Sequence, residues 1–174
     1  MPPSPNAPEE RGKEVDGRGY ADSNHSGENK TRRPCSGFVI LLNTAIIQWL
    51  SKKQATIETS VFGAEFVAMK IVMETLRGIR YKLRIIGVPI SGLSYIYEDN
   101  MSVIHINLRP ESTLKKKSNY ICYHNFCESI ATDESLTGHV STNKNFADLA
   151  TKVLYGGKRR FRVSNFLYEI YDDL

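Results

Sequence analysis

The sequence predicts an α/β protein with a mixed five-stranded sheet, three antiparallel strands followed by two parallel ones, flanked by helices. Two observations predict this class. Three β-prone runs come first in the chain, and helical and strand-like segments alternate after them. The length of 174 residues suffices for one compact core and is short for two.

The three antiparallel strands are expected early in the chain, at residues 15–22, 36–42 and 45–51. Only Asn43 and Thr44 separate the second from the third, which is the spacing of a tight hairpin. Gly17 and Gly19 weaken the first strand, and with it the edge that presents Asp22.

A long amphipathic helix follows. Thr59 or Ser60 can cap its start, and the pattern ends near Arg77 or Tyr81. Its apolar residues form two stripes at helical spacing, Phe62, Phe66, Met69 and Met73 on one side and Val61, Ala68 and Val72 on the other.

Glu65 falls within the second apolar stripe of this helix, where packing against the core is expected. Burying an unpaired carboxylate costs several kcal/mol, roughly, unless the group is protonated or meets a cation. Glu65 is therefore the carboxylate least easily explained as a surface residue.

The remaining elements are read from periodicity and turn residues. They are a strand at 94–99, helices at 101–108 and 119–132, a strand at 136–140, a turn at 143–145, a helix opening at 146–150, and a last helix at 163–171 after Gly156 and Gly157. Asn100 or Ser102 can cap the second helix. Asp99 thus stands at the carboxyl end of a strand, where open α/β sheets gather ligands.

The chain divides into three expected parts: a flexible Pro-rich lead-in at 1–14, one domain at 15–155 and a helical extension at 156–174. No apolar run approaches the roughly 18 residues of a membrane helix, and the start has no signal core. The odd count of three cysteines indicates no disulfide partner and a reducing, intracellular location, with cytoplasm and nucleus both open.

The net charge of +4 is mild, but basic residues gather in short clusters. These lie at 32–33, 52–53, 115–117 and 158–160. Each cluster by itself is also typical of a solvated loop, so charge alone is a weak argument for a polyanionic partner.

Each of the other acidic candidates has an ordinary alternative. Asp22 fits a turn at a strand end, and Asp99 fits a helix cap. Asp148 lies three residues after Asn145, so the pair resembles a capping box. Only the fold can decide whether these carboxylates meet Glu65.

Six segments in order carry a family resemblance. They are Tyr20-Ala21-Asp22, Ser51-Lys52-Lys53-Gln54, Glu58-Thr59-Ser60, Gly63-Ala64-Glu65-Phe66-Val67-Ala68, Tyr97-Glu98-Asp99-Asn100 and Phe146-Ala147-Asp148-Leu149-Ala150-Thr151-Lys152. Over residues 15–155 they resemble the ribonuclease H domain of copia-type retrotransposon Pol polyproteins. The resemblance implies the ribonuclease H fold, a mixed five-stranded sheet with helices on both faces.

The resemblance also implies a function. Asp22, Glu65, Asp99 and Asp148 match four acidic positions that bind two Mg²⁺ ions, with Mn²⁺ as a substitute. Such an enzyme is a magnesium-dependent endoribonuclease that hydrolyses the RNA strand of an RNA–DNA hybrid during reverse transcription. The expected partners are the hybrid and a reverse transcriptase domain within a longer polyprotein.

Further residues are assigned to the hybrid or to auxiliary roles. The candidates for nucleic-acid contacts are Ser23, Lys52, Lys53, Asn100, Lys115, Lys116 and Lys117. His139 is an auxiliary candidate for product release or protonation, and an ordinary strand-end residue is the alternative. Cys122, His124 and Cys127 spread around a helix, so a zinc site is rejected.

The alternative function is a non-catalytic nucleic-acid-binding or decayed fragment of a retroelement polyprotein. In this sequence only a Pro-rich stretch precedes the domain. All four acidic positions are occupied by acidic residues, which favours retained catalytic chemistry.

Overall fold

The computed structural model of the chain describes residues 11–24, 33–55, 60–107 and 117–164, with the side chains of residues 107 and 117–119 excepted. Most of the expected lead-in at 1–14, and most of the expected last helix at 163–171, lie outside these residues. The division of the chain at residues 14 and 155 therefore stays a prediction.

Five strands form one mixed sheet in the order β3-β2-β1-β4-β5. They are β1 (Gly17–Asn24), β2 (Cys35–Leu42), β3 (Ala45–Lys53), β4 (Ser94–Glu98) and β5 (Ser135–His139). The first three pair antiparallel, β4 runs parallel to β1, and β5 runs parallel to β4. This confirms the predicted fold class.

The hairpin between β2 and β3 turns at Asn43 and Thr44, as the sequence predicted. Asn43 has a φ of +54°, a conformation that asparagine tolerates better than most residues. Its side chain accepts the N–H of Asp16 at 3.0 Å, and its own N–H donates to the Asp16 carbonyl at 2.9 Å. The turn is thereby tied to the start of β1.

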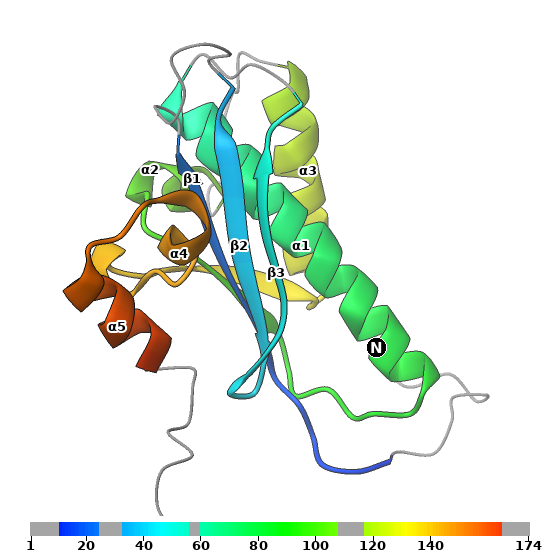
Figure 1. Ribbon diagram of the computed structural model, residues 1–174. Coiled ribbons are helices and arrows are strands. Elements are labelled where there is room, and N and C mark those ends of the chain that lie inside the picture. Colours follow the sequence, from blue (N-terminus) through cyan, green and yellow to red (C-terminus); the bar gives the residue numbers. More distant parts are fainter. Residues whose placement is uncertain (1–10, 25–32, 56–59, 108–116, 165–174) are drawn as a thin grey trace, which may run out of the picture.

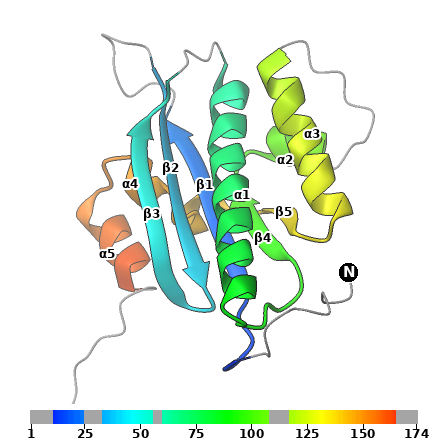
Figure 2. The same cartoon turned by 90° about the vertical axis from the view of Figure 1, so that its right-hand side faces the viewer.

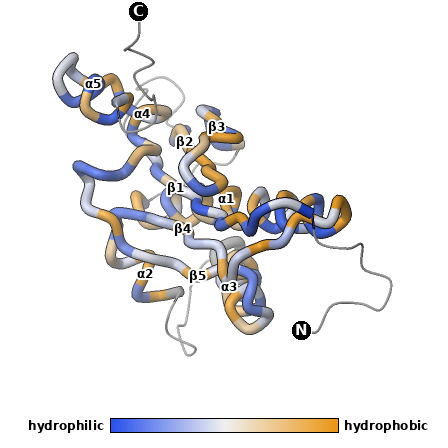
Figure 3. The backbone as a smooth tube through the Cα atoms, turned by 90° about the horizontal axis from the view of Figure 1, so that it is seen from below, coloured by the Kyte–Doolittle hydropathy of each residue, from blue (hydrophilic) through white to orange (hydrophobic). Residues whose placement is uncertain are grey.

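The helices cover both faces of the sheet. They are α1 (Val61–Ile85), α2 (Met101–Asn107), α3 (Lys117–Ala131), α4 (Asp148–Thr151) and α5 (Gly156–Ser164), with a 3-10 turn at Thr142–Lys144. The long helix α1 and α3 lie on one face, and α4 and α5 lie on the other (Figures 1 and 2). In the view from below, hydrophobic and hydrophilic residues alternate along α1 (Figure 3).

Two helix boundaries differ from the prediction. Helix α1 continues to Ile85, beyond the expected end near Tyr81, because Lys82, Leu83 and Arg84 are good helix formers. Helix α5 begins at Gly156, so the expectation that the last helix starts only at residue 163 was wrong. Glycine is tolerated at a helix start, where backbone N–H groups have no intrahelical partner.

The core lies between α1 and the central strands. Its fully buried side chains include Ile40, Phe66, Met69, Ile96 and Phe126, contributed by both layers. Burying a side chain of this size stabilises the fold by about 1.5–3 kcal/mol. The predicted stripe of Phe62, Phe66, Met69 and Met73 does face this core.

The expectation that glycines weaken β1 as an edge strand was wrong, because β1 is the central strand. A Cβ atom on Gly19 would clash with Val72 of α1, and one on Gly17 would lie 2.7 Å from the Ser94 hydroxyl. Gly19 thus lets α1 approach the middle of the sheet closely, whereas Gly17 leaves room for Ser94 of β4. The site described next depends on that approach.

None of the helices in the described part of the chain combines the length and apolar character required to cross a bilayer.

Candidate metal centre

Asp22 lies near the carboxyl end of the central strand. Its side chain is 1% exposed. Burial raises its pKa above the ordinary value, and a hydrogen bond from Thr151 and the positive charge of Lys152 oppose this rise. The side-chain amide of Asn145 donates to the carbonyl of Ala21, the residue before Asp22, at 2.8 Å and so fixes this end of the central strand.

Glu65 reaches the same place from the start of α1. Ser60 caps this helix, because its hydroxyl accepts the N–H of Gly63 at 3.1 Å. One turn later, a Glu65 oxygen accepts the backbone N–H of Ser23 at 2.9 Å. The predicted burial of Glu65 is confirmed, with 5% of the residue exposed.

The electrostatic environment of Glu65 is unfavourable to its charge. Burial, together with the negative charges of the nearby Asp22 and Asp99, raises the pKa of Glu65 to about 8. The hydrogen bond from Ser23 lowers it only in part. A cation at this position would remove the conflict.

Asp99 directly follows β4, which pairs in parallel with β1. Tyr97 faces Tyr20 in this pairing, so two residues further along each strand Asp99 comes opposite Asp22. The backbone N–H of Asp99 donates to the side chain of Glu98 at 3.0 Å. Asp99 is half-buried, the most accessible of the three carboxylates.

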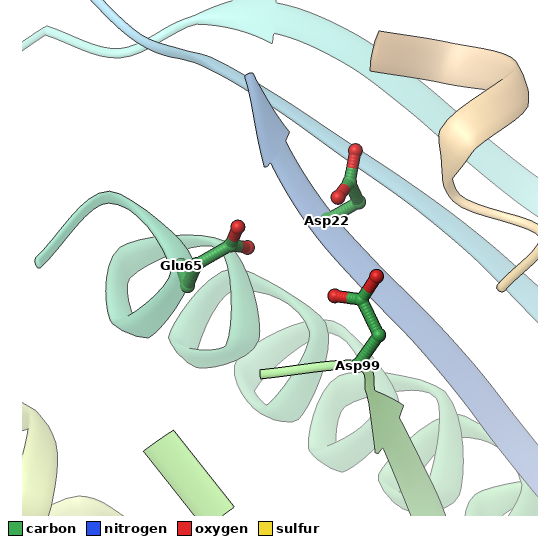
Figure 4. A group of neighbouring side chains, drawn as sticks. All are labelled: Asp22, Glu65 and Asp99. Carbon is green, nitrogen blue, oxygen red and sulfur yellow. The ribbon is translucent and has the colours of Figure 1, made fainter. Parts of the chain in front are cut away.

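The three side chains point toward one another from β1, α1 and the end of β4 (Figure 4). One carboxylate oxygen of each lies within 4.8 Å of those of the other two. Within the described ranges, this is the one grouping of three or more potential metal-ligating side chains. Hard carboxylate oxygens are the donors that Mg²⁺, Mn²⁺ and Ca²⁺ prefer, so the residues fit a divalent cation.

Asp148 is not one of these three, although it is 2% exposed and close by. It is the first residue of α4, and Lys152 connects it to the group, with the ammonium 2.6 Å from Asp148 and 3.0 Å from Asp22. Its other oxygen lies 2.7 Å from the guanidinium of Arg162. The capping-box alternative was wrong, because Asn145 accepts the N–H of Ala147 instead.

Lys152 and Thr151 were missed as site residues, although both stand in a segment that carries the resemblance. The Thr151 hydroxyl donates to Asp22. Burial by itself lowers the pKa of Lys152, but the hydrogen bond to Asp148 and the charge of Asp22 outweigh it and raise the pKa. The four-residue spacing from Asp148 to Lys152, an ion-pair spacing on a helix, could have indicated the pair.

Glu98 was also missed. It is fully buried, and one of its carboxylate oxygens has no hydrogen-bond partner among the described residues. Burial raises its pKa well above the ordinary value, and Glu65 and Asp99 raise it further. Glu98 is thus a fifth carboxyl group beside Glu65 and Asp99, and its burial favours the neutral, protonated form.

The candidate nucleic-acid contacts are placed as follows. Lys52 and Lys53 are exposed near the end of β3. Lys52 pairs with Ser36, which pairs with Ser23, so Lys52 lies two strands, or about 10 Å, from the site. Ser23 is buried.

Asn100 is half-buried, and its side chain accepts the N–H of Ser102, so Asn100 rather than Asp99 caps α2. Lys117 is the first residue of α3, and its side chain lies outside the described part of the chain. Lys115 and Lys116 lie outside it entirely.

His139 ends β5 and is exposed, which agrees with its expected place and does not test its role. Among the described residues, Cys35, Cys122 and Cys127 form no disulfide bond.

Comparison with known proteins identifies relatives by sequence, although no family model matches the chain. It is 27% identical over 135 residues to the retrovirus-related Pol polyprotein from transposon RE2 of Arabidopsis thaliana, covering 78% of this chain and 9% of that protein. It is 27% identical over 138 residues to that from transposon TNT 1-94 of Nicotiana tabacum, covering 79% and 10%. The chain thus spans about a tenth of the length of these relatives.

Solved structures with the same fold include ribonuclease H1 from Halobacterium salinarum, with a TM-score of 0.54, 12% identity, and coverage of 78% of this chain and 91% of that one. The prototype foamy virus protease-reverse transcriptase matches with a TM-score of 0.51 and 13% identity, covering 95% of this chain and 23% of that one. At these identities the likeness concerns the fold alone. The chain therefore carries a ribonuclease H-like domain that matches the Pol polyproteins of copia-type retrotransposons over about 78% of its length.

Proposed function

We propose that this chain is a metal-dependent endoribonuclease of the ribonuclease H type, which hydrolyses the RNA strand of an RNA–DNA hybrid during reverse transcription. One observation carries the proposal: carboxylate oxygens of Asp22, Glu65 and Asp99 lie within 4.8 Å of one another, at the carboxyl end of the central strands. The sequence similarity to Pol polyproteins from transposons supports assigning this acidic group to a reaction on nucleic acid.

The catalytic and metal-binding residues in this proposal are Asp22, Glu65, Asp99 and Asp148, and the ions are two Mg²⁺, with Mn²⁺ as a substitute. Two divalent cations, when bound, supply an activated water and stabilisation of the leaving 3′ oxygen. The half-buried Asp99 is the carboxylate most open to a scissile phosphate. Ser23 holds Glu65 in place through its backbone N–H.

The hybrid is the proposed substrate because its minor groove presents 2′-hydroxyls beside DNA, which allows recognition with little sequence preference. Lys52, Lys53, Lys115, Lys116 and Lys117 are proposed to contact phosphates. Ser23 and Asn100 are proposed to touch the backbone near the cut, and His139 to assist product release or protonation. The domain is proposed to act beside a reverse transcriptase in a longer polyprotein.

The test is cleavage of a hybrid labelled on its RNA strand. The wild-type chain should cut the RNA strand only with Mg²⁺ or Mn²⁺ present, and leave the same RNA intact in single-stranded form. Asp99→Asn should lower the rate by about 10³-fold or more, because it removes a charged ligand at the reacting centre. Asp133→Asn, at an exposed turn after α3, is the matched control and should cut normally.

A folded wild-type chain that binds the hybrid but never cuts it would contradict the proposal and favour a non-catalytic nucleic-acid-binding role. Circular dichroism of each variant distinguishes loss of chemistry from loss of fold. Cleavage that persists in Asp99→Asn would contradict the assigned site.

A further inference from the structure

Lys152 places a positive charge inside the acidic site. Its ammonium lies 3.0 Å from Asp22 and 2.6 Å from Asp148, and so bridges the three-carboxylate group and the fourth acidic residue. Asp22 and Lys152 are 130 residues apart in sequence, so folding rather than local structure creates this contact.

Asp148 is held from its other side by Arg162 of α5. The guanidinium is 3% exposed, lies 2.7 Å from the free oxygen of Asp148, and also donates to the Thr142 carbonyl at 2.7 Å. Both oxygens of Asp148 therefore already contact a cation. Asp22, Lys152, Asp148 and Arg162 form a chain of alternating charge.

The charges of this cluster are balanced by a single divalent ion. When ionised, Asp22, Glu65, Asp99 and Asp148 carry four negative charges, and Lys152 and Arg162 carry two positive ones. The buried Glu98 is counted in its neutral form, which burial favours. The difference is two negative charges. A second divalent ion would give the cluster an excess of positive charge as long as the ammonium stays between Asp22 and Asp148.

We propose that Lys152 acts as an internal cation that occupies Asp22 and Asp148 in place of a second divalent ion, so that the free chain binds one ion. A second ion can then bind only when Lys152 moves away from Asp148. The negative charge of a substrate phosphate compensates the positive charge that this second ion adds. Arg162 positions Asp148 for this exchange. The inference rests on the proposed function, because it assumes that the acidic group binds divalent cations.

The Lys152 side chain has room for such a movement. It is 36% exposed, whereas the side chains of Asp22 and Asp148 are 1% and 3% exposed. A lysine carries its charge on a flexible four-carbon stem, so the ammonium can move while the backbone stays in place. The buried Arg162 has no comparable freedom.

The test is isothermal titration of the folded full-length chain with Mn²⁺, without nucleic acid. The wild-type chain should bind one ion. Lys152→Met should bind two, with the second site strengthened roughly tenfold or more, because a like charge a few ångströms away has been removed. Lys152→Arg retains the charge and should bind one.

A double variant makes the role of Asp148 measurable. Lys152→Met combined with Asp148→Asn should return to one ion, because the second ion needs Asp148. A purely structural role of Lys152 would not produce this reversal. Lys152→Gln, which can still donate to one carboxylate, replaces Lys152→Met if that variant fails to fold.

Lys82→Met is the matched control. Lys82 is exposed on α1, 17 residues beyond Glu65, or about 25 Å along the helix. It should bind one ion like the wild type. Equal stoichiometry and affinity in wild type and folded Lys152→Met or Lys152→Gln would overturn the role of Lys152. Absence of any bound ion in all variants would overturn the metal site itself, whereas failed hybrid cleavage with the expected stoichiometries would overturn only the proposed reaction.

Discussion

At the scale of single residues, the site is built from carboxylates that the folded chain buries at a cost. Glu65 is tolerated because Ser23 donates one hydrogen bond to it, but burial and two neighbouring carboxylates still raise its pKa to about 8. The buried Glu98 retains a carboxylate oxygen without a partner among the described residues. These buried carboxylates lower the stability of the folded chain, and a bound cation would restore that stability.

Replacing Glu65 with glutamine should therefore stabilise the metal-free protein. Folding raises the pKa of Glu65 from 4.5 to about 8, so the folded state holds a proton that the unfolded state releases, and its stability falls as pH rises between these values. Glu65→Gln removes this penalty. The free energy of unfolding at pH 8 in EDTA should rise by roughly 1–2 kcal/mol, with little gain at pH 5.

Urea unfolding at the two pH values measures this difference. Glu74→Gln, an exposed glutamate on the same helix, is the control and should change stability by less than about 0.5 kcal/mol at either pH. An equal gain for Glu65→Gln at pH 5 and pH 8, or a loss at pH 8, would refute the electrostatic account of Glu65.

At the scale of elements, the packing of α1 on β1 decides whether Glu65 reaches Asp22. Of the two glycines in β1, Gly19 leaves space for Val72 and Leu76, so the helix lies close to the central strand. The same two residues argue against a strand when only propensity is considered. Their function becomes evident once the strand is known to be central and covered.

Gly19→Ala should force Val72 and Leu76 to move and should destabilise the fold by about 1–3 kcal/mol. Gly78→Ala is the matched control, because Gly78 lies on the exposed side of α1 with open space around it. That change should raise stability by about 0.5–1 kcal/mol through helix propensity. Chemical denaturation compares the two, and a Gly19→Ala protein as stable as wild type would show that α1 does not need the glycine.

At the scale of the whole molecule, the site couples three distant segments of the chain. Strand β1, helix α1 and the residue after β4 supply the three carboxylates. The residue after α4, Lys152, and Arg162 of α5 contact the fourth, Asp148. A cation bound at their meeting point stabilises the folded state only, since the unfolded chain does not hold these residues together.

Addition of Mg²⁺ should therefore raise the melting temperature, and more strongly at pH 8 than at pH 6. The cation must displace the proton of Glu65, whose pKa is about 8, so affinity rises with pH through this range. At an ion concentration of 100 times Kd the gain is about 2.7 kcal/mol. Scanning calorimetry with Mg²⁺ and with EDTA measures the effect, and a gain independent of pH would exclude Glu65 as a ligand.

The sequence by itself determined much of this protein. Hydrophobic periodicity and turn residues predicted the five strands and the long helix, because those signals are local. The apolar stripe around Glu65 predicted its burial, and the ordered motifs indicated the ribonuclease H fold. The meeting of Asp22 and Asp99 was implied only by the family resemblance, because the parallel pairing of β1 with β4 became known from the structure.

Only the tertiary structure decided which charges meet. The contacts of Lys152 with Asp22 and of Arg162 with Asp148 join residues on different elements, so no local pattern encodes them. Likewise, the roles of Gly17 and Gly19 depended on the strand being central rather than at an edge. Local propensity acts over a few residues, whereas the burial and the ion pairs of a side chain depend on which distant residues the completed fold brings next to it.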